Sequence, residues 1–253
     1  MTPQNAKSRV YGEPVDINEN ASKEFWNNRA EKYNETAPFV SVNLGDGNPE
    51  RAARWDEYEK THTLPLLNIH KNDTVLDIGC GVGRLSDILI PQCKYYLGAD
   101  YAEDLIAVAK KRAARLSGDY AFYVLPIQSI SAEAFDFTAN GGKFSVIIMA
   151  GVLFYLNDDN VTKGINAVLS VAAPNCRIYI QNSVAVNERL TLNAFYSDEL
   201  KADYSAVYRS AKEYEKLFAP LTENGFSLTH SADIQIETAD NSETKRVYQI
   251  YGR

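Results

Sequence analysis

The sequence is poor in the residue types that mark several large classes of protein. Its 253 residues include only three cysteines and three histidines. The cysteines, at positions 80, 93 and 176, form no closely spaced pair, so neither a disulfide framework nor a zinc site is indicated. No run of about 18 apolar residues occurs, which argues against a membrane-spanning helix. We therefore expect no metal site, no membrane partner and a reducing compartment.

Positive charge is also in short supply. The chain has 26 basic and 33 acidic side chains, a net charge of −7. Such a chain repels a phosphate backbone, so a nucleic-acid partner is disfavoured. The first 16 residues are polar and lack the apolar core of a signal peptide, so we expect a cytoplasmic location. Nothing in the pattern predicts an oligomeric state.

What the sequence does contain is apolar and aromatic material. Apolar residues make up 45% of it, and there are 16 tyrosines. This is enough for one large core, and we expect a single domain over residues 1–253. Polar residues up to about position 20 are expected to form a loose arm. Helical spacing then predicts a helix at 25–33 and another that includes His62, so residues 1–70 are expected to form a helical cap.

From residue 74 onward, short apolar runs alternate with amphipathic stretches, which is typical of βαβ units. The pattern predicts an α/β, Rossmann-like fold with a mainly parallel seven-stranded sheet and helices on both faces. We place strands at 75–78, 95–98, 121–124, 144–148 and 177–180, and helices at 84–90, 103–116, 158–172 and 211–224. The stretches 226–236 and 246–251 are expected to pair as an antiparallel C-terminal hairpin. Residues 72–182 would be a cofactor-binding core, 184–210 a substrate lid insert, and 211–253 the C-terminal helix and hairpin.

The most informative segment is a buried strand that runs into alternating glycines at 79, 81 and 83 and then into a helix. Glycines let the backbone turn sharply and let a ligand approach it closely. This predicts a nucleotide-like ligand at the carboxyl edge of the sheet. A dinucleotide fingerprint would need glycine at position 84, where this chain has Arg84, and no Gly-Lys-Ser/Thr follows as in a phosphate-binding P-loop.

The order Asp77-x-Gly79-x-Gly81-x-Gly83 resembles the first motif of the class I S-adenosylmethionine-dependent methyltransferases. The resemblance covers residues 72–182 and implies S-adenosyl-L-methionine as cofactor and S-adenosyl-L-homocysteine as product. It implies that Asp77 holds the ammonium group of the cofactor and that Asp100 accepts the ribose hydroxyls. From the residues alone, Asp100 could equally cap the following helix.

Other segments extend the resemblance to further contacts. Gln128 and Ser129 follow the third strand, where relatives contact the adenine, although a plain loop is an equal alternative. Ala150 and Gly151 are the small residues expected beneath the methionine part. The predicted cofactor-binding residues are Arg29, Tyr33, Asp77, Gly79, Cys80, Gly81, Gly83, Asp100, Tyr101, Gln128, Ser129, Ala150 and Gly151.

Methyl transfer needs a nucleophile held near the methyl carbon in a dry pocket, and the protein itself need not attack. His62 is the first candidate for a general base and Tyr155 the second, although a surface or core histidine is an open alternative. The predicted substrate-binding residues are Trp26, Tyr155, Tyr204, Tyr208 and Arg209. These aromatic residues could instead cover the sheet edge, and Arg209 could face solvent.

The resemblance therefore predicts an enzyme that moves a methyl group to an oxygen, or a nitrogen, of a small polar metabolite such as a sugar or sugar phosphate. A nicotinamide-dependent oxidoreductase is one alternative, because both carboxylate roles also occur with NAD(P). A protein that binds S-adenosylmethionine without catalysis is the other.

Overall fold

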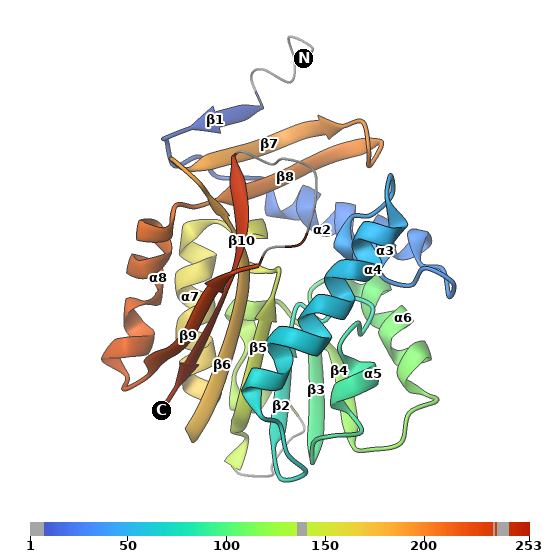
Figure 1. Ribbon diagram of the computed structural model, residues 1–253, viewed down its shortest axis with the longest axis vertical. Coiled ribbons are helices and arrows are strands. Elements are labelled where there is room, and N and C mark those ends of the chain that lie inside the picture. The colour runs from blue at the N-terminus through green and yellow to red at the C-terminus, as the bar shows by residue number, and fades with distance from the viewer. Residues whose placement is uncertain (1–7, 136–140, 235, 237–242) are drawn as a thin grey trace.

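A seven-stranded sheet runs through the middle of the protein (Figure 1). The structure is a computed structural model that describes residues 8–135, 141–234, 236 and 243–253. The strand order is β4-β3-β2-β5-β6-β10-β9. The strands are β2 (Thr74–Ile78), β3 (Tyr95–Asp100), β4 (Tyr120–Val124), β5 (Phe144–Ala150), β6 (Ala172–Ala185), β9 (Ser227–Asp233) and β10 (Thr244–Gly252).

The five neighbouring strands β4, β3, β2, β5 and β6 are parallel. Strand β10 is antiparallel to both of its neighbours, β6 and β9. The structure confirms the predicted Rossmann-like sheet and the antiparallel C-terminal hairpin. Strand β6 is much longer than the predicted stretch 177–180, because its upper half pairs with β10 beyond the end of β5. Position 235 of the predicted hairpin lies outside the described residues.

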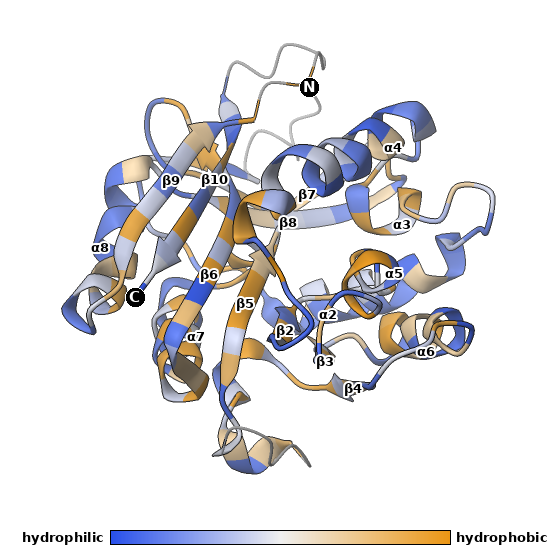
Figure 2. Ribbon diagram, turned by 60° about the horizontal axis from the view of Figure 1, so that its bottom comes forward, coloured by the Kyte–Doolittle hydropathy of each residue, from blue (hydrophilic) through white to orange (hydrophobic). Residues whose placement is uncertain are grey.

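Helices cover both faces of this sheet (Figure 1). The helices are α2 (Glu19–Arg29), α3 (Val40–Asn43), α4 (Pro49–Tyr58), α5 (Ser86–Leu89), α6 (Glu103–Ala113), α7 (Asp158–Val171) and α8 (Ala211–Glu223). One core joins α7 and α8 to the sheet through Ile165 and Phe218, and another joins α5 and α6 through Leu89 and Ile106. Strand β5, buried on both faces, is mostly hydrophobic in Figure 2, as expected for a central parallel strand.

A second, smaller sheet lies above the carboxyl ends of the main strands (Figure 1). It consists of β1 (Arg9–Tyr11), β7 (Leu190–Ser197) and β8 (Ala202–Tyr208), all antiparallel. The expectation of a loose arm up to position 20 is therefore wrong for β1. A three-residue strand carries no periodic signal of its own and forms only because it pairs with β7.

The predicted cap is helical in α2, α3 and α4, and residues 1–7 lie outside the described residues. Asn18 caps α2 and Asn48 caps α4 through their side chains, and Pro49 occupies the first turn of α4. A single π-helical turn, Glu59–Thr63, then continues α4 towards the sheet. Turns of this kind often occur at functional sites.

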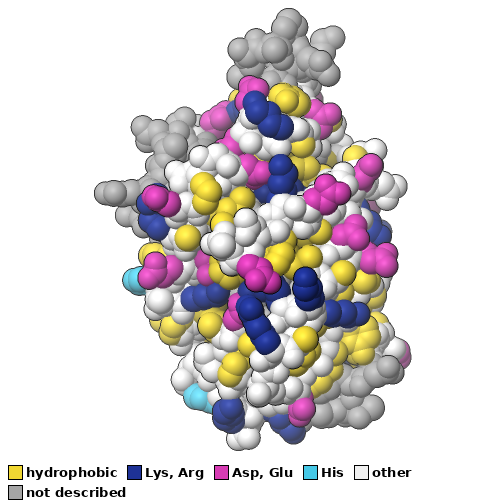
Figure 3. All heavy atoms as spheres, turned by 90° about the vertical axis from the view of Figure 1, so that its right-hand side faces the viewer, with side chains coloured by type: hydrophobic (Ala, Val, Ile, Leu, Met, Phe, Trp, Pro, Cys, Tyr) yellow, Lys and Arg dark blue, Asp and Glu magenta, His cyan; other side chains and the backbone are white. Residues whose placement is uncertain are grey.

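Two observations concern the surface. In the part of the chain that the structure describes, none of the helices is both long and apolar enough to cross a bilayer. On the face shown in Figure 3, acidic and basic side chains are interspersed, with hydrophobic side chains between them.

Candidate active site

A cavity of about 830 Å³ lies at the carboxyl edge of the main sheet. Its floor is formed by residues that follow β2, β3, β4 and β5, including Gly79, Tyr101 and Gly151. Its other walls come from α2, the α3–α4 region and the β7–β8 hairpin. The cavity therefore opens where ligands bind in open α/β sheets, between the sheet and the cap.

The glycine loop forms one wall of the cavity. Its backbone has conformations that residues with side chains rarely adopt. Gly79 and Gly81 line the cavity, with φ values of +70° and +53°. A Cβ atom on Gly79 would lie 2.2 Å from a methyl carbon of Val152, and one on Gly81 would lie 2.9 Å from a methyl carbon of Val42. Bare backbone is thus required here, and a ligand can approach it closely.

Gly83 serves a different purpose from the one predicted. It does not line the cavity, and a Cβ atom there would lie 2.9 Å from Ser86 Oγ and 3.3 Å from Ala109 Cβ. This glycine allows close packing of the loop against α5 and α6. The prediction that Gly83 contacts the cofactor is therefore corrected. Cys80, also predicted as a contact, does line the cavity.

Asp77, at the end of β2, is a buried carboxylate that lines the cavity. Its Oδ2 accepts a hydrogen bond of 2.7 Å from the Tyr96 hydroxyl. Burial raises its pKa to about 7, because water no longer stabilises the charge. A cationic group in the cavity would restore that stabilisation, which fits the expected contact with an ammonium group.

Asp100, for which the sequence left ribose binding and helix capping open, accepts hydrogen bonds from two backbone N–H groups. Its Oδ2 accepts a 2.9 Å hydrogen bond from Gly81 N–H, and its Oδ1 accepts one of 2.8 Å from Ala102 N–H at the start of α6. It also lines the cavity, and burial raises its pKa to about 6. Each oxygen retains a lone pair that can accept a hydroxyl of a ligand.

Two polar atoms in the cavity wall are buried and lack a hydrogen-bond partner among the described residues. They are the hydroxyl of Tyr101 and Oε1 of Gln128. Leaving such an atom unpaired costs about 1–3 kcal/mol, so these atoms fit a ligand with complementary polar groups. Ser129, by contrast, is exposed and does not line the cavity, because the 3-10 turn Ile127–Ser129 directs Ile127 and Gln128 towards it.

Two small residues at the end of β5 are predicted to lie beneath the methionine part of the cofactor. Ala150 and Gly151 line the cavity. Gly151 has a φ of +76°, and its N–H donates a 2.9 Å hydrogen bond to the carbonyl of Gln181, which ties β5 to β6 at this edge.

Beyond this point the cavity wall is aromatic. Tyr155, Tyr204, Tyr208 and Trp26 all line it, as predicted. The Tyr204 hydroxyl lies 3.0 Å from the Tyr208 hydroxyl and 3.4 Å from that of Tyr155, and the Trp26 and Tyr155 rings meet edge to face at 4.9 Å. Burial raises the pKa of each of these phenols above its ordinary value. They therefore remain protonated near neutral pH, which makes Tyr155 a hydrogen-bonding group rather than a ready base.

The other candidate base lies outside the cavity. His62 is exposed on the π-helical turn, stacks on the Tyr58 ring at 4.5 Å and contacts the Thr61 hydroxyl at 2.8 Å. The turn directs Glu59, not His62, into the cavity. The structure contradicts His62 as the base for that reason.

Arg29 and Tyr33 also lie behind the cavity wall. Arg29 is buried, pairs with Asp46 at 2.6 Å and donates to the carbonyl of Ser41 at 2.8 Å. The Tyr33 ring lies beside Arg112, 5.8 Å from its guanidinium carbon. Neither residue lines the cavity, so the prediction that they contact the cofactor is corrected. They instead support the loop that carries Val42.

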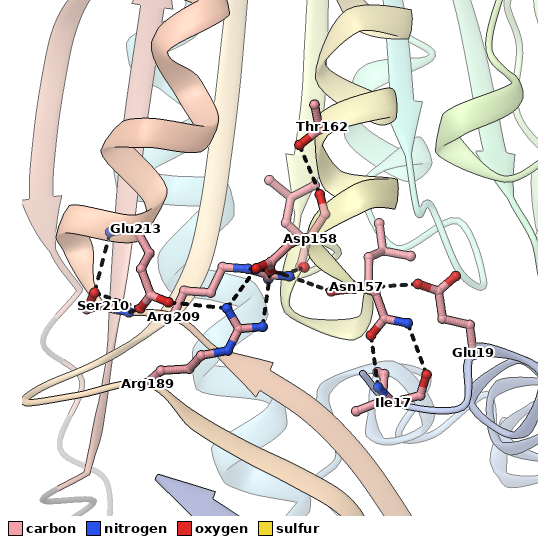
Figure 4. A network of polar contacts seen from close by, with 11 residues as sticks. Ile17, Glu19, Asn157, Asp158, Thr162, Arg189, Arg209, Ser210 and Glu213 are labelled. Atoms are coloured by element: carbon pink, nitrogen blue, oxygen red, sulfur yellow. Dashed lines mark hydrogen bonds and ion pairs between the residues drawn. The ribbon is translucent and has the colours of Figure 1, made fainter. Parts of the chain in front are cut away.

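Arg209 is the largest correction to the predicted substrate site. Its side chain is completely buried and does not line the cavity. It donates to Asp158 at 2.7 Å and to the carbonyls of Leu153 and Leu156 (Figure 4). Arg189, which directly precedes β7, also pairs with Asp158. The two arginines therefore anchor the base of the β7–β8 hairpin to the start of α7.

Sequence reasoning missed all three arginines in the cavity wall, Arg51, Arg84 and Arg246. Arg84 donates to Asp56 at 2.9 Å and forms an ion pair with Glu59, which in turn accepts a hydrogen bond from Tyr179. Arg246, on β10, lies over the indole ring of Trp55. No signal in the sequence could identify these pairs, because the partners come from remote segments.

The cap and the hairpin also meet at the cavity mouth. Arg51 of α4 forms an ion pair with Glu199, which follows β7, and both residues line the cavity.

Comparison with known proteins identifies relatives of the whole core. A family model described as a methyltransferase domain matches residues 69–250. Phosphoethanolamine N-methyltransferase 1 of Triticum aestivum is 22% identical over 210 residues, which cover 82% of this chain and 39% of that protein. This chain thus spans about two fifths of the length of that relative.

Solved structures show the same fold. Phosphoethanolamine N-methyltransferase 1 of Haemonchus contortus, in complex with phosphoethanolamine and S-adenosylhomocysteine, superposes with a TM-score of 0.72 at 19% identity. The match covers 92% of this chain and 48% of that one. An S-adenosylmethionine-dependent methyltransferase of Leishmania major superposes with a TM-score of 0.60 at 16% identity over 92% of this chain and 82% of that one.

The family match spans most of the chain and includes the glycine loop, Asp77, Asp100 and the strands that carry them. The unpaired polar atoms and the bare glycine backbone of the cavity fit the cofactor of that family. The chain therefore belongs to the methyltransferase domain family, and its cofactor is S-adenosylmethionine.

Proposed function

We propose that the protein catalyses transfer of the methyl group of S-adenosylmethionine to a nitrogen or oxygen of a small polar metabolite. The observation that carries this proposal is the continuity of one cavity. It extends from the glycine loop, past Gly151, to the hydroxyl cluster of Tyr155, Tyr204 and Tyr208. The cofactor and a small acceptor can therefore share one enclosed space.

The chemistry divides between the cofactor and the chain. When bound, S-adenosylmethionine supplies an electrophilic methyl group. Gly79, Gly81 and Asp100 hold the adenosine end, and Asp77 holds the ammonium group. Trp26 and the three tyrosines exclude water and orient the acceptor in line with the methyl carbon.

The wall chemistry favours nitrogen as the acceptor atom, whereas the sequence had left a slight preference for oxygen. Among the described residues that line the cavity there is no histidine. The carboxylates that line it already have hydrogen-bond or ion-pair partners. Asp77 and Asp100 accept hydrogen bonds, and Glu59, Glu199 and Glu19 are paired with Arg84, Arg51 and two asparagines. An alcohol would benefit from a free base, whereas an amine needs only to arrive unprotonated. The names of the Triticum and Haemonchus relatives also point to an amine.

A methyl-transfer assay tests the proposal. The protein is incubated with methyl-labelled S-adenosylmethionine and matched pairs of small amines and alcohols, and S-adenosylhomocysteine and labelled product are measured. We expect turnover with an amine and none with the alcohol of the same skeleton.

Calorimetry separates this function from the alternatives. S-adenosylhomocysteine should bind to the protein, and NAD should not. Cofactor binding without product across the whole panel would support the non-catalytic alternative, and tight NAD binding alone would reverse the proposal.

A further inference from the structure

Arg246 is a cation that the expected cofactor contacts do not use. It lies on β10 opposite Ser183 of β6, and both side chains line the cavity. Its guanidinium carbon is 3.7 Å from the centroid of the Trp55 ring. Burial lowers its pKa, because the charge has lost much of its contact with water.

Within the part of the chain that the structure describes, the guanidinium of Arg246 has neither a hydrogen bond nor an ion pair. The carboxylate of Glu59, which raises the pKa of Arg246, is already paired with Arg84 and accepts a hydrogen bond from Tyr179. The other cavity arginines, Arg51 and Arg84, each have an acidic partner. Arg246 is half-buried, lies over an indole ring and lacks an acidic partner, so a ligand that supplies an anion would stabilise its charge.

The surroundings of Arg246 supply further hydrogen-bond donors. Tyr155, Tyr204 and Tyr208 line the same cavity as Arg246, and the hydroxyls of Tyr204 and Tyr208 lie 3.0 Å apart. These phenols are protonated at neutral pH, as their raised pKa values require. An arginine beside clustered hydroxyls is the donor set that binds a phosphate or carboxylate group.

The place of Arg246 in the sheet assigns this anion to the acceptor rather than to the cofactor. Between β2, which carries the glycine loop, and β10 lie β5 and β6. Three strand spacings amount to roughly 14 Å. Ser183 also lies two residues beyond Gln181, the partner of Ala150, so Arg246 stands above the end of β5. This is the far side of the cavity from Asp100.

We propose that Arg246, together with the hydroxyls of Tyr204 and Tyr208, binds an anionic group of the methyl acceptor, a phosphate or a carboxylate. The inference rests on the proposed methyl transfer and narrows its substrate class to anionic metabolites. The planar guanidinium lies over the Trp55 ring, and its fork of N–H groups favours a bidentate oxyanion. Because the chain has a net charge of −7, binding of an anionic acceptor requires a local cation such as Arg246.

Titration with simple anions tests the proposal. Inorganic phosphate and acetate are titrated calorimetrically into the protein saturated with S-adenosylhomocysteine. The variants are Arg246→Gln, Arg246→Lys and Tyr208→Phe, and Lys111→Gln removes an exposed positive charge on α6 as a matched control. Thermal unfolding establishes that each variant folds.

We expect Arg246→Gln to raise the dissociation constant of the preferred anion by at least about tenfold, as the loss of charge-assisted hydrogen bonds requires. Arg246→Lys should give an intermediate value, Tyr208→Phe a rise of about fivefold, and Lys111→Gln no change. Tighter binding of phosphate than of acetate assigns a phosphate ester, and the reverse order assigns a carboxylate. If Arg246→Gln fails to fold, the Arg246→Lys and Tyr208→Phe variants carry the same comparison.

Three results would overturn the proposal. They are no binding of either anion to the wild type, equal binding to wild type and Arg246 variants, and a loss confined to S-adenosylhomocysteine affinity, which would assign Arg246 to the cofactor carboxylate. Failure of the wild type to bind S-adenosylhomocysteine at all would instead be a failure of the proposed methyl transfer.

Discussion

Arg209 donates a hydrogen bond from Nε to Asp158 Oδ1 at 2.7 Å, although the two residues are 51 positions apart. The contact fixes the end of β8 to the first turn of α7. A carboxylate at this position also interacts favourably with the N-terminus of α7. This pair, with Arg189, gives the β7–β8 hairpin rigid ends while its tip, at 197–202, reaches the cavity mouth.

Replacement of Arg209 by Met should therefore act on stability. The carbonyls of Leu153 and Leu156 would lose their donor, and we expect the free energy of unfolding to fall by about 2–4 kcal/mol in urea. Lys245→Gln, which breaks the exposed pair with Asp233, should cost less than about 1 kcal/mol. Wild-type stability together with a raised KM for the acceptor would return Arg209 to the substrate site.

Gly79→Ala should weaken binding of S-adenosylhomocysteine by at least about tenfold, because the new Cβ atom meets Val152 and displaces the loop. Gly225→Ala is the matched control, since Gly225 also has a positive φ, +85°, but has open space around its Cβ position. It should cost about 1 kcal/mol of stability and leave affinity unchanged.

The double variant Gly79→Ala, Val152→Ala separates the clash from backbone strain. With the Val152 methyl groups gone, the nearest remaining atom is Val152 Cβ at 3.4 Å. Calorimetry should show most of the affinity restored. If affinity stays low in the double variant, the Gly79 backbone conformation, not the contact with Val152, controls binding.

Asp77 should make the stability of the ligand-free protein depend on pH. Its folded pKa of about 7 lies above the ordinary value of 3.8, so the protonated carboxyl stabilises the fold. That contribution is complete below about pH 4 and is lost as the pH rises through 7. Tyr96, Arg84, Glu59 and Asp100 are the groups that act on Asp77.

Comparison with Asp77→Asn isolates this effect, because the amide does not titrate. Between pH 4 and pH 8, urea unfolding of the wild type should lose up to about 4 kcal/mol relative to the variant. S-adenosylhomocysteine, whose ammonium group we propose to pair with ionised Asp77, should oppose that loss in the wild type only. Parallel pH curves for the two proteins would show that Asp77 is ionised in the fold at all these pH values.

The ion pair between Arg51 and Glu199 should help to close the cavity. Hydrogen exchange on addition of S-adenosylhomocysteine should slow most at 40–51 and at the hairpin tip, 197–202, and less in α7. Glu199→Gln should speed exchange at both segments in the bound state. Asp198→Asn, next to it and highly exposed, is the control and should change neither. Identical exchange with and without ligand would make these segments static cover.

The local features of this protein follow from short stretches of its sequence. The alternation of apolar runs and helices predicts the parallel sheet, since buried central strands must be apolar on both faces. Asp77 lies near the end of β2, and Gly79 and Gly81 follow in the next turn, so their arrangement is encoded in a short run of the chain. Asp100 could be placed because it ends the next strand, whose neighbour is fixed by the sheet.

Only the tertiary structure decided which remote side chains meet. Arg209 and Arg246 both lie in or beside strands of the C-terminal half, and their local sequence does not distinguish them. Pairing of β10 with β6 puts Arg246 in the cavity, whereas the ends of the β7–β8 hairpin carry Arg209 to Asp158. His62 and Glu59 are separated by less than one helical turn, yet only Glu59 faces the cavity. Such choices depend on strand register and helix rotation, which are set by packing over the whole molecule and not by neighbouring residues.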